Sequence, residues 1–273
     1  MKKTMKLKTV FLIVFALGEF VSLCAENPAS LSVGVEFGGN EVSTSLNEKW
    51  NIRQDVGSNY YGYNSSSNSI ATNMYISHFA VKPEIRLFDD KLAFSSGLRF
   101  SNVMSDVSIW GNQMDNAGYF YLRYNNTGLN TEYAKVKMMN ETSNYLGIPI
   151  DVKLIPFSFW KMDFYIKTGI EFNFKLSSNT QIDFANDEMN EFEQTIIDHV
   201  GLKVNNLYST WSSALGVSLG NKNRLQYNIE LLLPSFFITN NNSTLVNTEM
   251  FTGFRCSIQF PIRQSIIKQT NTK

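Results

Sequence analysis

The stretch YLGIPIDVKLIPF, residues 145–157, alternates between two kinds of side chain over most of its length. Aliphatic residues occupy every second position: Leu146, Ile148, Ile150, Val152 and Leu154. The positions between them hold Gly147, Pro149, Asp151 and Lys153. Because successive side chains of a β-strand point to opposite faces, this pattern predicts a strand with one hydrocarbon face and one polar face. The fold depends on what each face meets.

The same alternation recurs along the chain, whereas helical periodicity is never sustained for long. We count about eight alternating segments, at residues 31–38, 77–87, 92–103, 145–157, 162–176, 207–219, 224–231 and 253–262. The sequence therefore predicts an all-β fold.

The connections between these segments alternate in length. Short, turn-forming connections follow the second, fourth and sixth segments, and long polar stretches separate the others, at residues 40–75, 105–144, 178–206 and 235–248. Four long loops are unusual in a compact soluble domain. Outer-membrane barrels, however, combine short periplasmic turns with long extracellular loops. We therefore predict a closed antiparallel transmembrane β-barrel of about eight strands, with long loops on one side and short turns on the other.

In such a barrel the aliphatic faces meet lipid and the polar faces line the lumen. The sheet is closed because, in hydrocarbon, only a helix or a closed barrel satisfies all of its backbone hydrogen bonds. The alternative fold is a secreted soluble sandwich or lipocalin-like barrel, with the apolar faces pointing inward. Periodicity alone does not distinguish the two.

The N-terminus carries four lysines before an apolar run at residues 10–17 and a small-residue end at Ala25. This is the pattern of a secretory signal peptide over residues 1–25, followed by a barrel domain over residues 26–273 and export to the outer membrane. An uncleaved anchor helix is the alternative. Cleavage after Ala25 leaves Cys256 as the single cysteine, so no internal disulfide is expected.

Three segments resemble the PorT-like outer-membrane β-barrel family of Bacteroidetes-type bacteria. Residues 145–150 (YLGIPI) are similar to that family's Y-L-x-I-P strand start, and residues 92–101 (LAFSSGLRFS) and 164–174 (FYIKTGIEFNF) share its glycine-containing strand pattern. The resemblance implies an outer-membrane barrel, often of unassigned role. One departure is the polar tail after Phe260, since many such barrels end on an aromatic residue.

The polar faces of the strands carry charges of both signs. We predict that these form a structural, salt-bridged network inside the barrel, since eight strands leave little more than room for side chains. A narrow ion path or a polar ligand site is the alternative. The predicted lumen residues are Glu36, Lys82, Glu84, Arg86, Arg99, Asp151, Lys153, Lys167, Glu171, Lys175, Arg224, Glu230 and Arg255.

Signals for catalysis are thin. The two histidines, His78 and His199, lack a nucleophile and an orienting group at an informative spacing, and no HxxxH or CxxC pattern predicts a metal. We expect a non-catalytic protein of structural or interaction type, without metal or cofactor. The alternatives are a lipid-modifying membrane enzyme, a narrow solute passage and a soluble ligand binder.

The long polar stretches are the candidate binding surface. Rigid rings among amides and hydroxyls suit binding to sugars or proteins, although a girdle or strand extension explains the rings equally well. The residues concerned are Tyr60, Tyr61, Tyr63, Tyr119, Tyr121, Arg123 and Tyr124. The acidic stretch at residues 183–193 favours a solvated loop, with a short helix near residues 188–198. A formal net charge of +0 gives no footprint for nucleic acid, so we expect a monomer whose partners are lipid and an extracellular protein or glycan.

Overall fold

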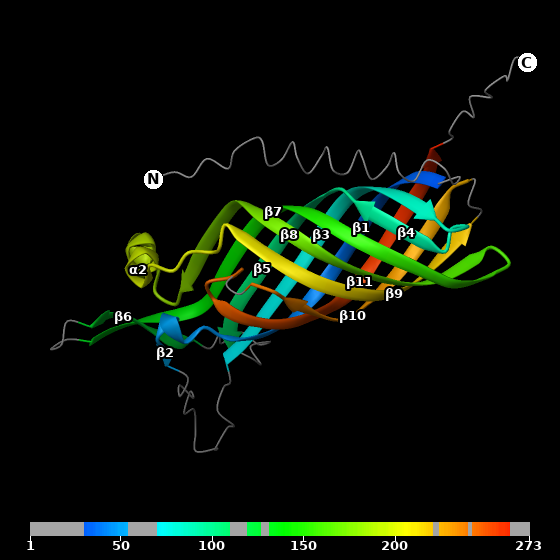
Figure 1. The fold of residues 1–273 in the computed structure, drawn as a ribbon. Helices are drawn as coiled ribbons and strands as arrows, with labels where there is room; N and C mark the ends of the chain where they lie inside the picture. Colours follow the sequence, from blue (N-terminus) through cyan, green and yellow to red (C-terminus); the bar gives the residue numbers. More distant parts are fainter. Residues whose placement is uncertain are drawn as a thin grey trace, which may run out of the picture.

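The computed structural model describes residues 30–53, 70–109, 119–126, 131–220, 224–239 and 242–262. Antiparallel strands dominate it and wrap into a tilted cylinder (Figure 1). The strands of the cylinder are β1 (Ser30–Leu46), β3 (Ile70–Leu87), β4 (Leu92–Ser96), β5 (Leu98–Ile109), β7 (Thr131–Phe159), β8 (Met162–Phe184), β9 (Leu207–Gly220), β10 (Gln226–Phe237) and β11 (Val246–Ile262). The predicted signal peptide, Tyr60, Tyr61 and Tyr63 lie outside the described residues.

The sheet closes on itself. Strand β1 pairs with both β3 and β11, and β7 pairs with β8 as well as with β4 and β5, so the described strands form a closed ring. Because β4 and β5 together fill one place between β3 and β7, the ring has eight members over the described ranges. The predicted closed antiparallel barrel is confirmed, and its backbone needs no water for hydrogen bonding.

Strands β4 and β5 are one passage across the wall, interrupted at Gly97. Facing the gap on β3 are Lys82 and Pro83, and Pro83 has no N–H to donate to the ladder. A side chain at Gly97 would overlap the carbonyl oxygen of Val81, so the close approach of the two strands requires glycine here.

The two ends of the barrel differ. At one end β3 and β4 are joined by residues 88–91, β7 and β8 by Trp160 and Lys161, and β9 and β10 lie five residues apart in the chain. Strand β1 starts and β11 finishes at this same end, since Leu31 pairs with Ile262. We call it the turn end and the opposite one the loop end. In outer-membrane barrels the short turns face the periplasm.

At the loop end the strands run much further than the sequence predicted. Strand β7 begins at Thr131 and pairs along its length with β8, which continues to Phe184. The prediction of loops over all of residues 105–144 and 178–206 was therefore wrong. These segments are polar because their outward faces lie beyond the hydrocarbon, where strands do not need an apolar exterior.

A small extension stands beyond the loop end (Figure 1). Strand β6 (Phe120–Asn126) pairs with the start of β7, and β2 (Ile52–Arg53) pairs with β6. The 3-10 helices η1 (Glu48–Trp50) and η2 (Asp187–Phe192) and the helix α2 (Glu193–Val200) complete it, and the last two contain the predicted short helix. None of the helices in the described part of the chain is long and apolar enough to cross a membrane.

Candidate functional site: the barrel lumen

The two faces of the wall are assigned by side-chain exposure. On β8, Ile166 and Ile170 are 48% and 41% exposed, whereas Lys167 between them is only 5% exposed. The apolar face runs from Phe164 to Phe174. The ten steps between these residues rise about 3.3 Å each, and a tilt of about 40° reduces that length to a height of about 25 Å. That height matches the hydrocarbon thickness that outer-membrane barrels cover.

The protein is an outer-membrane β-barrel. The alternative soluble fold, with apolar faces turned inward, is wrong for this part of the wall. Exposed Phe157, Phe159 and Trp160 cluster at the turn end, where an aromatic girdle meets the lipid headgroups.

The lumen of this membrane section is packed with charge. Among the described residues, six carboxylates and six cations are buried there, namely Glu36, Glu84, Asp151, Asp163, Glu171 and Glu230 with Lys82, Arg86, Arg99, Lys153, Lys167 and Arg255. Of the predicted lumen residues, Lys175 is half-buried and donates to the carbonyl of Val204 at 2.7 Å. Arg224 was placed wrongly: it precedes β10 and is exposed, because the alternating pattern extends past the end of the strand.

Glu36 on β1 is the hub of the network. Its carboxylate pairs with Lys82 and, at 2.5 Å, with Arg99, and Lys167 Nζ lies 3.5 Å away. The network continues from these cations, since Lys82 also pairs with Asp151 at 3.1 Å, Arg99 with Glu171 and Lys167 with Glu230. One carboxylate on β1 is thus linked to side chains of three other strands, β3, β5 and β8.

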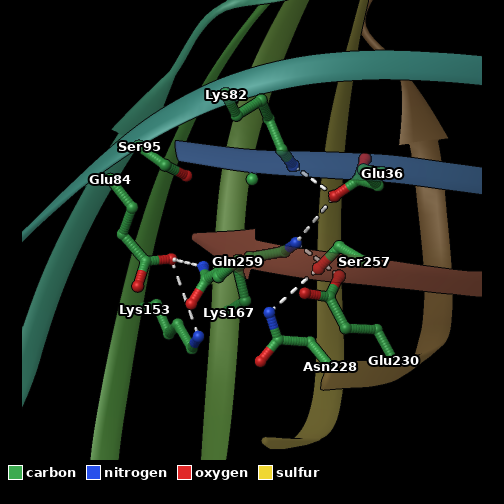
Figure 2. Close-up of a pocket in the computed structure, with 11 residues that line it drawn as sticks. Glu36, Lys82, Glu84, Ser95, Lys153, Lys167, Asn228, Glu230, Ser257 and Gln259 are labelled. Atoms are coloured by element: carbon green, nitrogen blue, oxygen red, sulfur yellow. Dashed lines mark hydrogen bonds and ion pairs between the residues drawn. The ribbon is translucent and has the colours of Figure 1, made fainter. Parts of the chain in front are cut away.

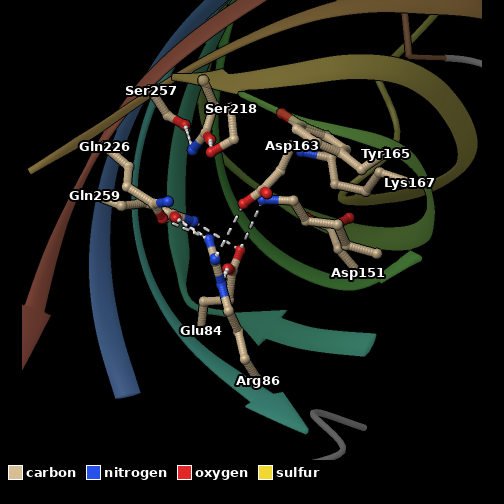
Figure 3. A network of polar contacts seen from close by, with 12 residues as sticks. Glu84, Arg86, Asp151, Asp163, Tyr165, Lys167, Ser218, Gln226, Ser257 and Gln259 are labelled. Atoms are coloured by element: carbon tan, nitrogen blue, oxygen red, sulfur yellow. Dashed lines mark hydrogen bonds and ion pairs between the residues drawn. The ribbon is translucent and has the colours of Figure 1, made fainter. Parts of the chain in front are cut away.

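Arg86 organises a second group nearer the turn end (Figure 3). Its guanidinium donates to Glu84 Oε1, Gln226 Oε1 and Gln259 Oε1, each at 2.8 Å. Gln259 in turn donates to Glu84 Oε2 at 2.7 Å, and Asp163 Oδ2 lies 3.9 Å from Arg86 Nη1. Such a group fixes the planar guanidinium from several sides, which a lysine could not reproduce.

Glycines make room for the larger lumen side chains. Tyr165 lies over Gly216 of the neighbouring strand, where any side chain would overlap the ring. The same ring receives Lys153 Nζ at 4.1 Å from its centroid, and its hydroxyl donates to Glu230 at 3.0 Å. The wall and its contents are therefore fitted to each other.

Between the two groups lies a cavity of about 10 Å³, shown in Figure 2. Glu36, Lys82, Lys167 and Glu230 border it on one side and Glu84 and Lys153 on the other. A volume of this order holds about one water molecule. The charged section is therefore filled by its own side chains.

Towards the loop end the lumen becomes apolar. The inward-pointing side chains of β3 are Lys82 and Glu84 nearer the turn end, but Met74 and Ile76 nearer the loop end. These side chains belong to a buried cluster that also takes in Trp50, Tyr145 and Phe251. Above the membrane section the barrel is thus built like a soluble one, with its core inside.

The segment 242–245 between β10 and β11 folds into this apolar section, although the sequence had placed it in an external loop. All four residues are buried. Glu141 accepts from the backbone N–H of Thr244 at 2.9 Å and from its hydroxyl, and Trp50 Nε1 donates to the Thr244 carbonyl at 2.8 Å. We call this segment the inner cap, because it covers the charged section from the loop end.

Sequence reasoning missed Asp163 and Glu141. Asp163 occupies an inward position on β8, so parity with Tyr165 and Lys167 could have found it. Glu141 lay in a stretch assigned to a loop, where parity was not applied.

The remaining candidates are dispersed. His78 is buried in the lumen, with Nε2 at 3.6 Å from Glu36 Oε1, and His199 is exposed on α2. Tyr121, Arg123 and Tyr124 lie in β6, and Tyr119 immediately precedes this strand. Within the described ranges, no group of three or more His, Cys, Asp and Glu side chains could hold a metal ion.

No protein-family model and no curated protein sequence matches the chain. Among solved structures, it is similar to the outer membrane protein OprG from Pseudomonas aeruginosa, with a TM-score of 0.43 and 8% identity over 86% of this chain and 97% of that one. It is also similar to the translocator domain of autotransporter NalP from Neisseria meningitidis, with a TM-score of 0.31 and 6% identity over 94% of this chain and 97% of that one. For LpxR from Salmonella typhimurium, the TM-score is 0.26 and the identity is 10% over 85% of this chain and 99% of that one. At these scores the likenesses carry no argument, and the assignment rests on strand pairing and exposure.

Proposed function

We propose that this protein is a non-catalytic outer-membrane barrel of PorT-like type, which anchors a folded extension at the cell surface for contact with an extracellular protein or glycan. The observation that carries the proposal is the filled lumen. A charged section with room for about one water is covered by an apolar section and the inner cap, which is the arrangement of an anchor rather than of a passage.

The extension supplies the contact surface. The ring of Tyr121 packs edge-on against Tyr119 and Tyr133, at centroid distances of 5.5 and 6.2 Å. Lys135 Nζ lies 4.8 Å from the centroid of Tyr119. Rings held by one another expose apolar faces with polar edges at little entropic cost, which suits sugars and protein surfaces alike.

Conductance of the purified protein in a planar bilayer tests the filled lumen. We expect no discrete current steps under conditions in which a bacterial porin, added as a positive control, conducts. Steps that depend on the folded protein would contradict an anchor and favour a solute passage.

Trypsin added to intact cells tests the display. Lys203 is exposed in the irregular segment between α2 and β9, and Lys161 is exposed at the turn end. We expect cleavage after Lys203 in intact cells and cleavage after Lys161 only once the outer membrane is permeabilised. The reverse order would mean that the extension faces the periplasm.

A lipid-modifying reaction has little support in the lumen. His78 is enclosed there, and its Nε2 has no hydrogen-bond partner among the described residues, so no hydroxyl nucleophile is held against that nitrogen. If the protein modifies lipid A or phospholipid when supplied in vesicles, and His78→Ala abolishes that activity while the barrel stays folded, the non-catalytic proposal fails.

A further inference from the structure

A groove of about 530 Å³ crosses the outer face of the wall towards the loop end. Leu231 and Phe254 border it on one side and Tyr75 and Met104 on the other, and all four side chains are exposed. Between them lies Gly39 of β1. The groove is shallow and open along the outer face of the wall.

Gly39 is the reason that the groove is open. It pairs with Phe254 of β11 and with Ser77 of β3, so it lies between two larger neighbours in the same row of the sheet. A Cβ added there would have the Ile76 carbonyl oxygen, at 4.0 Å, as its nearest neighbour. A larger residue would therefore project into the groove without straining the wall.

Among the described residues that border the groove, Glu41 supplies the only carboxylate. Glu41 follows Gly39 on the same face of β1 and pairs with Tyr75 and Thr252, one row nearer the loop end. Its side chain is exposed, and the contacts within the described residues give it no ion pair. An anionic group at the edge of the hydrocarbon is costly unless a cation lies beside it.

We propose that this groove holds one membrane lipid with a primary amine in its headgroup. Its acyl chain lies over Gly39, between Phe254 and Tyr75, and its ammonium pairs with Glu41. The position favours this occupant, because the groove opens towards lipid and the carboxylate lies at the headgroup end of the apolar face. The hydroxyl of Thr252, which pairs with Glu41 and also borders the groove, can donate a hydrogen bond to the headgroup or accept one from it.

The variants separate the two parts of the site. Gly39→Leu fills the groove, and Glu41→Gln removes the charge while leaving the space. Cys256→Leu is the matched control, because Cys256 is exposed on the same face of β11 but lies outside the groove. Heat-dependent gel mobility shows whether each variant remains a closed barrel.

The experiment is native mass spectrometry of the purified full-length protein after exchange with vesicles of phosphatidylethanolamine or phosphatidylglycerol. We expect one bound phosphatidylethanolamine, retained roughly fivefold better than phosphatidylglycerol, in line with one partly exposed ion pair. Glu41→Gln should abolish the preference, Gly39→Leu should abolish retention, and Cys256→Leu should change neither.

Three results would overturn the proposal. Equal retention by Gly39→Leu and the wild type would place the lipid elsewhere, and equal retention of the two lipids by the wild type would remove the role of Glu41. A dimer that Gly39→Leu dissociates, without bound lipid, would assign the groove to a second copy of the chain.

Discussion

Removal of the negative charge at the hub of the lumen should destabilise the barrel more than any other single charge change. Glu36→Gln preserves the shape of the side chain but leaves Lys82, Arg99 and Lys167 facing a neutral amide. The balance of six carboxylates and six cations in the charged section becomes five to six. Breaking one buried ion pair typically costs about 3–5 kcal/mol, because it leaves an uncompensated charge away from water.

The loss should lie near the lower end of that range, about 3 kcal/mol, since Lys82, Arg99 and Lys167 each keep a second carboxylate. Urea-induced unfolding from lipid vesicles, followed by tryptophan fluorescence, measures it. Glu249→Gln, on an exposed position of β11, is the control and should change stability by less than about 0.5 kcal/mol.

A double-mutant cycle identifies the cause. Adding Lys82→Met to Glu36→Gln restores the charge balance, so the second substitution should cost less in that background than it does alone, by about 1–3 kcal/mol. If Glu36→Gln is as stable as the wild type, or if the two substitutions are additive, the carboxylate is not the hub of a coupled network.

Three further predictions follow from single contacts. Glu141→Gln weakens the acceptor for the inner cap, so residues 242–245 should exchange their amide hydrogens faster, with a loss of about 1.5–3 kcal/mol in local opening free energy. Unchanged exchange would show that Glu141 does not hold the inner cap. Gly216→Val should lower the unfolding free energy by about 1–3 kcal/mol, because the new side chain overlaps the ring of Tyr165, and a stability equal to the wild type would show that the ring is not seated there. Arg224→Gln should stay within about 0.5 kcal/mol of the wild type in urea unfolding, whereas a larger loss would return this exposed residue to the network.

The membrane section could be predicted from sequence because lipid on one face of the wall and the crowded, charged lumen on the other impose a strict alternation. At Ile150 and Asp151, for example, hydrocarbon selects the outward residue and the crowded lumen selects a charge that has a partner. The closure of the ring followed from the same argument, since an open edge in lipid leaves backbone groups unpaired.

The loop half was predicted poorly because the rule reverses there. Once the strands leave the hydrocarbon, Val107 and Met139 point inward while Asp106 and Asn140 point outward. An outward apolar face therefore no longer marks a strand in this half. The alternation of a soluble barrel, which was considered for the whole chain, describes this half.

The site was predicted in part for the same reason. Parity places Glu36, Arg99 and Lys167 in the lumen, but it does not say which cation each carboxylate meets, because those contacts cross the barrel between strands distant in sequence. The inner cap was beyond prediction, since its burial depends on Glu141 and Trp50 from two other segments.

The central claim is that the hydrocarbon face of each strand meets lipid while the charged face fills the lumen. Spin labels placed singly along β8 from Phe164 to Phe174, in a background without Cys24 and Cys256, test it most directly in reconstituted vesicles. Accessibility to oxygen should peak at the positions of Ile166, Ile170 and Phe172 and be low at the positions of Tyr165, Lys167 and Glu171. A peak at the second set, or no alternation at all, would contradict the account.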